Sequence, residues 1–285
     1  MPDLAWILPY DPSPLALVAF ALTAAGYAWA AANLPPGAGP GWLRQLTFWL
    51  GLALCYAVMQ TRFDYYAQYM FFVHRGQHLV LHHLGPFLMV LSNPLPVLRY
   101  WHGRLPAGLR RRARPLILAY RVLQHPVVAP VLFVGLIYLW LWPPVHFVAM
   151  LSRPLYWLMN TSMLVDGLLF WWLVLDPRSP WSATGQRVAG VLGYGRRILI
   201  LALVAIPQMA LGAWIVFSQG TVYDVYEVCG RAWPMAPATD QLLGGLLTWI
   251  PPAMMSVLGI LLLVRRALHD DARRHAPYLT EAPLP

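Results

Sequence analysis

The chain has 285 residues, of which 59% are hydrophobic and 11% charged, and its mean hydropathy is +0.54. Soluble domains carry about 25% charged residues and disordered chains have low hydrophobicity, so the composition excludes both classes. All 20 basic residues are arginine, so there is no lysine for a Schiff base and a retinal-type seven-helix protein is excluded. The sequence predicts an all-α integral membrane protein with aromatic belts at both interfaces.

Seven segments are apolar and long enough to cross a hydrocarbon core of roughly 30 Å as helices. Turn-forming stretches such as Asn93-Pro94-Leu95-Pro96 separate them. Because no internal repeat or linker divides the chain, we expect a single integral-membrane domain over residues 1–285. The predicted spans are 14–33, 45–61, 66–91, 126–147, 154–175, 197–217 and 240–264.

The arginines predict the orientation of this bundle. Most of them lie in the short basic segment 99–121, in the connection 176–197 and in the tail 265–285. By the positive-inside rule these parts are cytoplasmic, so the N-terminus lies outside and the C-terminus inside. We expect segment 99–121 to lie at the interface and to be held by anionic lipid, and we expect no binding of nucleic acid.

The third predicted span carries four histidines, His74, His78, His82 and His83. At 100° per residue the first three form a drifting stripe on one helix face, whereas His83 falls opposite His74. His74 and His78 are one turn apart and can share a ligand, but His82 is about 12 Å from His74 along the axis, too far for the same metal ion. With the inner boundary near residue 91, His74 is about 5 Å inside the outer edge. Intramembrane ionisable groups are functional candidates; the alternative is neutral imidazoles that bridge helices.

A metal site needs a further ligand from the same outer half of the membrane. His146, at the end of the fourth predicted span, is the first candidate, and its imidazole is expected to meet those of His74 and His78 near an opening to the outer side. Imidazole suits copper, zinc and iron, and thioether sulfur selects Cu(I), so the mixture favours a copper ion, Cu(I) in particular. The further candidates are His82, Met59, Met70 and Cys55.

Two carboxylates are also singled out by their positions. Asp166 lies near the centre of the fifth predicted span, where it must be protonated or paired. Because His82 and His83 lie at a similar depth, we expect a buried polar contact with one of them; the alternative is a bond to backbone or Ser162. Asp240 is expected to cap the start of its own helix, the seventh span.

Several motifs recur together along most of the chain. They are His74 and His78 followed by Asn93-Pro94, His146 behind the aromatic fourth span, Gly167 to Trp172, Tyr223 to Tyr226, and Asp240-Gln241 through Trp249-Ile250-Pro251. In these motifs the chain resembles the CtaG-like cytochrome c oxidase assembly factors. One position departs from the pattern, because Asn160 stands where the family pattern suggests a histidine. A site that needs a ligand there is either absent or completed by Met159 or Met163.

The resemblance implies a multi-pass protein of the bacterial plasma (inner) membrane that is not an enzyme. It implies a function in handling or delivering copper to cytochrome c oxidase at the outer face, with oxidase subunits and a periplasmic copper donor as partners. Three other classes remain open. A transporter would suit the proline-broken spans and the buried aspartate, although no inverted repeat is visible. A di-iron membrane enzyme needs about eight histidines, mostly on the cytoplasmic side, and a haem-b electron-transfer protein could use His78 and His146 as axial ligands.

Overall fold

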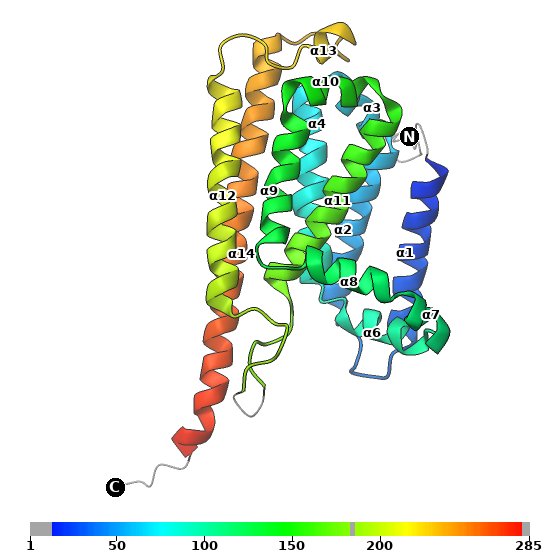
Figure 1. Ribbon diagram of the computed structural model, residues 1–285, viewed down its shortest axis with the longest axis vertical. Coiled ribbons are helices and arrows are strands. Elements are labelled where there is room, and N and C mark those ends of the chain that lie inside the picture. Colours follow the sequence, from blue (N-terminus) through cyan, green and yellow to red (C-terminus); the bar gives the residue numbers. More distant parts are fainter. Residues whose placement is uncertain (1–12, 183–185, 281–285) are drawn as a thin grey trace.

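The computed structural model describes residues 13–182 and 186–280 of the chain. Apart from one isolated β-bridge between Trp181 and Arg187, the regular structure in these ranges is helical. The long helices stand side by side as a bundle (Figure 1). They are α1 (Pro14–Asn33), α2 (Trp42–Gln60), α3 (Arg62–Tyr69), α4 (Phe71–His78), the π-helix η2 (Leu79–Leu84), α5 (Gly85–Leu91), α6 (Leu95–Arg104), α7 (Ala107–Arg112), α8 (Arg114–Leu123), α9 (Val128–Leu141), α10 (Pro143–Leu151), α11 (Arg153–Leu175), α12 (Tyr194–Phe217), α13 (Val225–Val228) and α14 (Pro237–Thr280).

The described helices are consistent with a multi-pass membrane protein. Five of them, α1, α2, α11, α12 and α14, are long and apolar enough to cross a membrane. A sixth is added if α8 and α9, which meet at a bend of 76°, count as one span. The remaining difference from the seven predicted spans lies in the third one. It is divided among α3, α4, η2 and α5, each of which is too short to be counted alone.

The third predicted span is interrupted at two points. Met70 has extended backbone angles (φ −137°, ψ 123°), which separate α3 from α4. Further along, the chain widens into η2, in which the backbone N–H of Gly85 donates to the carbonyl of Val80, five residues back. Pro86 has no N–H to give to the His82 carbonyl, which is the bond an α-helix needs there. The π-helix therefore forms where proline removes an α-helical bond.

The two polar ends of the predicted topology also differ in detail from the sequence expectation. Segment 99–121, expected to lie at the interface with a short helix over 104–121, is part of three helices, α6, α7 and α8, which lie across one end of the bundle (Figure 1). The fourth predicted span ends early, because Trp142 is extended and starts the separate helix α10. His146 consequently lies in α10 and not at the end of the spanning helix.

The segment α4–η2–α5 lies in the middle of the bundle. It packs against α2, α11 and α14, while α12 and α14 pair with one another along their length. α1 is at the edge and packs against α2 and α6 (Figure 1). The central position buries all four histidines of the segment, of which His74 and His82 are 0% exposed.

At the end of the bundle near α6 to α8, two arginines hold the end of α11. Arg266 donates to the carbonyl of Leu175 at 2.9 Å, and Arg197, which is fully buried, donates to that of Asp176 at 2.7 Å. Cationic side chains satisfy the last carbonyls of a helix and interact well with its dipole. Arginines that predict topology from the sequence thus also terminate a helix.

Candidate functional site

The imidazoles of His74, His78 and His146 lie together at the end of the bundle opposite α6 to α8. The ring centroid of His74 is 4.3 Å from that of His78 and 5.2 Å from that of His146. α4 supplies the first two rings from successive turns, and α10 supplies the third. The three residues are 0%, 1% and 1% exposed, respectively, so the group is enclosed by protein. We call it the histidine cluster.

The ring nitrogens of this cluster are used unequally. His146 Nδ1 lies 2.9 Å from the carbonyl oxygen of Trp140, to which only an N–H can donate, so Nε2 accepts from the Tyr226 hydroxyl at 3.1 Å. His78 Nδ1 accepts from Arg75 at 3.3 Å, and its Nε2 donates to Asn160 Oδ1 at 3.1 Å. Both nitrogens of His74 are buried and have no hydrogen-bond partner in the described part of the chain.

The side chains adopt a hydrogen-bonded arrangement and not a preformed coordination sphere. Within the residues that the structure describes, no group of three or more His, Cys, Asp or Glu side chains has the geometry to hold a metal ion. A metal bound by all three rings would replace the bond from Tyr226 to His146 and one of the two bonds of His78. His74 needs no such exchange, because its lone pair is free for a ligand.

Aromatic side chains cover the cluster where the sequence suggested an opening. Tyr223 stacks on Phe71 with a centroid distance of 4.2 Å and donates to the carbonyl of Leu141 at 3.0 Å. Burial raises the pKa of the phenols of both Tyr223 and Tyr226, so both remain neutral donors. Tyr226 also lines a surface hollow of about 560 Å³ together with Trp233 and Met235. One phenol ring therefore separates this hollow from His146.

Arg75 is a central residue that the sequence analysis did not single out. It is 5% exposed, and its Nε donates to Thr248 Oγ1 at 2.9 Å. No carboxylate in the described ranges lies within ion-pair distance of its guanidinium. The positive charge of Arg75 therefore lies beside His78 without a neutralising acidic side chain. An arginine inside a predicted span is itself a signal of function, and that signal was present at position 75.

A second polar layer lies one turn further along the same segment. Asp166, expected to contact His82 or His83, has its Oδ2 3.0 Å from His82 Nε2. His83 Nε2 lies 2.8 Å from Gln208 Oε1 of α12. On an ideal α-helix His83 would point away from the stripe; in η2 both imidazoles face neighbouring helices. Gln208 could not be found from the sequence, because its partner depends on the π-turn.

The remaining candidate ligands lie in other places. Met59 and Cys55 belong to an apolar cluster with Val58 and Leu81. Met70 packs with Ala67 and Val73 at the join of α3 and α4. Of the expected outer ligands, the structure places the three histidines together, while these three side chains pack in apolar clusters.

A hydrogen-bonded carboxylate network lies beside the cluster and was also missed. Gln77 Nε2 donates to Asp64 Oδ1 at 2.7 Å, and the Tyr156 hydroxyl donates to the same oxygen at 2.8 Å. The Tyr156 ring lies 6.1 Å from that of His74. These bonds join α3, α4 and α11 and fix the wall of the cluster. No sequence spacing connects the three residues.

Comparison with protein families matches residues 25–270 to the cytochrome c oxidase caa3 assembly factor family (Caa3_CtaG). The chain belongs to this family. The resemblance drawn from the sequence motifs is thereby confirmed, and the matched range contains every member of the histidine cluster.

Two curated relatives carry no functional name. They are the uncharacterized proteins Mb0105 of Mycobacterium bovis and MT0111 of Mycobacterium tuberculosis, each 29% identical over 218 residues. The alignments cover 73% of this chain but only 31% of each relative, so the family member spans less than a third of their length. No solved structure matches the chain.

Proposed function

We propose that this family member is a non-catalytic assembly factor that holds Cu(I) in the histidine cluster and delivers it to cytochrome c oxidase at the outer face of a bacterial plasma membrane. The oxidase subunit that receives the ion and a periplasmic copper donor are its proposed partners. The assembly function follows from the family, and the copper chemistry follows from the donor set.

The observation that carries the proposal is the state of His74. A buried polar group is normally hydrogen-bonded, and leaving it unpaired costs free energy. His74 is 0% exposed with both nitrogens unpaired, and it lies between two further imidazoles. Such a residue is explained by a ligand that binds there, and neutral imidazoles are ligands for copper.

The surroundings favour a monovalent ion. The cluster is enclosed by protein, and the uncompensated guanidinium of Arg75 contacts His78. In a medium of low dielectric constant, repulsion between this charge and a bound cation grows with the charge of the cation. Cu(I) therefore meets half the repulsion that Cu(II) or Zn²⁺ would meet. Met59 and Met70 pack in separate apolar clusters, whereas Met159 and Met163 pack in the cluster that contains Phe71, Tyr223 and Tyr226.

The proposed topology has seven spans with the N-terminus outside and the C-terminus in the cytoplasm. It adds the consecutive helices α4, η2 and α5, residues 71–91, to the candidate spans as one broken span. The arginines of α6 to α8 then face the cytoplasm, as the positive-inside rule requires. The histidine cluster lies toward the outer side, from which the ion leaves without crossing hydrocarbon.

The haem alternative lacks space at this position. The cavity adjoining His78 and Arg75 has a volume of about 10 Å³, enough for a water molecule. A porphyrin between His78 and His146 would require these helices to separate.

The test is copper binding by the detergent-purified protein under reducing, oxygen-free conditions. We expect about one Cu(I) per chain in competition with a chromogenic chelator, and a loss of at least tenfold in affinity for His74→Ala/His78→Ala. The matched control is His102→Ala/His125→Ala, which removes two exposed histidines outside the cluster. His74→Gln keeps a polar side chain in case the double variant fails to fold. Equal copper binding by folded wild type and His74→Gln contradicts the proposal.

A further inference from the structure

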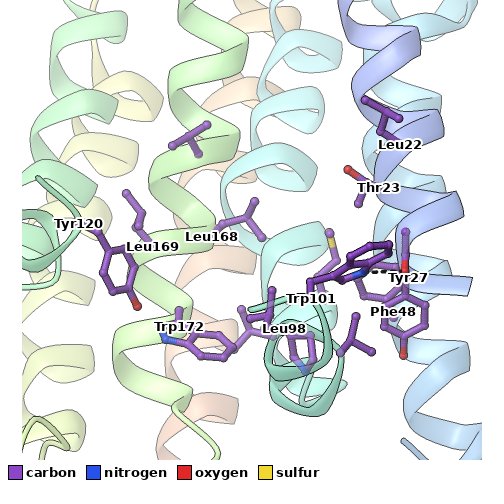
Figure 2. Close-up of a pocket in the computed structure, with 16 residues that line it drawn as sticks. Leu22, Thr23, Tyr27, Phe48, Leu98, Trp101, Tyr120, Leu168, Leu169 and Trp172 are labelled. Carbon is purple, nitrogen blue, oxygen red and sulfur yellow. Dashed lines mark hydrogen bonds between the residues drawn. The ribbon is translucent and has the colours of Figure 1, made fainter. Parts of the chain in front are cut away.

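A long apolar groove runs between α1 and α11. It consists of two hollows of about 650 Å³ and 370 Å³ that share Thr23, Met89 and Leu168. Each volume lies in the range of about 300–1,000 Å³ typical of pockets that enclose small organic ligands. Figure 2 shows the larger hollow, with Leu22 and Thr23 of α1 on one side, Leu168 of α11 on the other, and Leu169 beside Tyr120.

The groove exists because α1 is held at its edges. α1 packs against α2 and α6, and Trp101 of α6 donates its indole N–H to the carbonyl of Gly26 at 3.0 Å (Figure 2). Between these contacts and α11, no side chain of the described residues fills the space. An apolar hollow at the depth of the hydrocarbon core accepts hydrocarbon chains.

One polar atom in this wall lacks a partner. Tyr27 lines the larger hollow, is 3% exposed, and stacks on Phe48 with a centroid distance of 3.6 Å. Its hydroxyl has no hydrogen-bond partner in the described part of the chain. Buried tyrosine hydroxyls normally have one, so this atom indicates that the occupant carries a hydrogen-bonding group as well as hydrocarbon.

The end of the groove near Tyr27 is next to a positively charged surface. α6 and α8 contribute Leu98, Trp101 and Tyr120 to the lining. Five of the arginines of α6 to α8 are exposed, and none of these five has an acidic partner in the described ranges. They are Arg99, Arg111, Arg112, Arg114 and Arg121.

Acidic side chains at this end of the bundle are engaged elsewhere. Asp176 pairs with Arg178 at 2.6 Å, and Asp270 accepts from Ser179 and Tyr194, each at 2.6 Å. The surface of α6 to α8 is therefore complementary to an anion outside the chain.

We infer that the α1–α11 groove binds one anionic glycerophospholipid. Its acyl chains lie between α1 and α11, its ester or phosphate oxygens accept from the Tyr27 hydroxyl, and its headgroup lies against the arginines of α6 and α8. A zwitterionic lipid would cover the apolar wall but would not neutralise the arginines. A partner helix would cover the wall but would neither accept from the Tyr27 hydroxyl nor neutralise the arginines.

The first experiment measures which lipids stay with the protein. Wild type purified in mild detergent from a membrane of phosphatidylethanolamine and phosphatidylglycerol is analysed by native mass spectrometry. We expect one bound phosphatidylglycerol, enriched at least fivefold over its bulk share, and loss of this enrichment in Leu168→Trp, which fills both hollows. The control Leu203→Trp fills a similar hollow of about 580 Å³ between α9 and α12 and retains the enrichment.

The second experiment tests the two polar contacts separately. Tyr27→Phe removes only the unpaired hydroxyl, and Arg99→Gln/Arg121→Gln removes two charges; each is expected to lower the enrichment at least threefold. The control Arg265→Gln/Arg273→Gln removes two exposed arginines of α14, far from the groove, and leaves the enrichment unchanged (Figure 1). Equal retention of both lipids by wild type, an unaltered enrichment in Tyr27→Phe, or a copurified polypeptide displaced by Leu168→Trp overturns the inference.

Discussion

His74, His78 and His146 have the same side chain but different chemical states. His146 is fixed as a tautomer by the Trp140 carbonyl, and its remaining nitrogen accepts from Tyr226. His78 is held between Arg75 and Asn160. Of the three, only His74 has both nitrogens without a hydrogen-bond partner in the described part of the chain. If copper enters, His74 binds without exchanging a bond, and the other two imidazoles exchange a hydrogen bond for the metal.

Because copper would have to replace the hydrogen bond from Tyr226 to His146, Tyr226 is expected to lower the affinity for Cu(I). Tyr226→Phe removes the hydroxyl that occupies His146 Nε2 and keeps the covering ring. Because a neutral hydrogen bond contributes about 0.5–1.5 kcal/mol, we expect Cu(I) affinity to rise about two- to tenfold in chelator competition. Tyr223→Phe is the control, since its hydroxyl donates to the Leu141 carbonyl and to no imidazole. A fall in affinity, or the same rise in both variants, contradicts this assignment.

At the scale of single residues, the sequence predicted what depends on distance along a helix. The rise per residue was enough to put His82 and Asp166 at one depth, and the structure has them 3.0 Å apart. The partner of Asp240 was predicted wrongly, because its carboxylate does not cap its own helix. It accepts from the backbone N–H groups of Phe71 and Phe72, 169 and 168 positions away in the sequence. Such a contact depends on tertiary packing and leaves no local pattern.

At the scale of elements, this contact links α14 to the start of α4. Met70 provides no side-chain cap, so the first N–H groups of α4 depend on Asp240. The carboxylate also interacts favourably with the positive end of the helix dipole. His74 lies in the first turn of α4, so its position depends on a residue of α14.

Removing this cap should weaken both the fold and the site. For Asp240→Ala we expect a loss of about 1–2 kcal/mol in stability, seen as a lower midpoint of thermal unfolding in detergent, together with reduced copper retention. Asp224→Ala is the matched control, because Asp224 is exposed on the same end and its side chain makes no capping bond. Unchanged unfolding of Asp240→Ala would show that α4 starts without help from α14.

Helix existence was predictable from hydropathy, and helix interruptions were not. The apolar runs gave α1, α2, α11 and α12 to within a few residues. Met70 becomes extended with no glycine or proline beside it, whereas Trp142 precedes Pro143, which disfavours helical backbone at the residue before it. The break at Trp142 is what carries His146 into α10, over the end of α4, so the geometry of the cluster depends on a feature that periodicity does not reveal.

At the scale of the whole molecule, the arginine distribution and the proposed copper site depend on one orientation. The arginines of α6 to α8 lie at one end of the bundle, and α3, α10 and α13 lie at the other (Figure 1). If the basic end is cytoplasmic, the histidine cluster is near the outer surface. If it is not, the cluster faces the cytoplasm and delivery to the outer face fails.

Cysteine labelling tests this orientation directly. In a Cys229→Ser background, with Cys55 buried and 1% exposed, Gln219→Cys and Gly108→Cys place thiols at opposite ends. We expect a membrane-impermeant maleimide to label position 219 in intact cells and position 108 only after permeabilisation. Space for a side chain is open at Gly108. The reverse pattern would invert the proposed topology.

The π-helix η2 restricts which insertions and deletions such a chain can accept during evolution. A ring closed five residues back contains one residue more than an α-helical ring, so η2 is equivalent to a single-residue insertion absorbed inside a helix. A one-codon deletion between Leu79 and Leu84 would remove the extra residue and shorten the widened turn, while Pro86 would still leave one helix carbonyl without its donor. After the deletion, His82 and His83 could no longer both face neighbouring helices. Either Asp166 or Gln208 would therefore lose its hydrogen bond to a histidine. The number of residues in this segment is thus constrained independently of their identity. In an alignment of family members, we expect gaps to be rarer there than in the connections between helices.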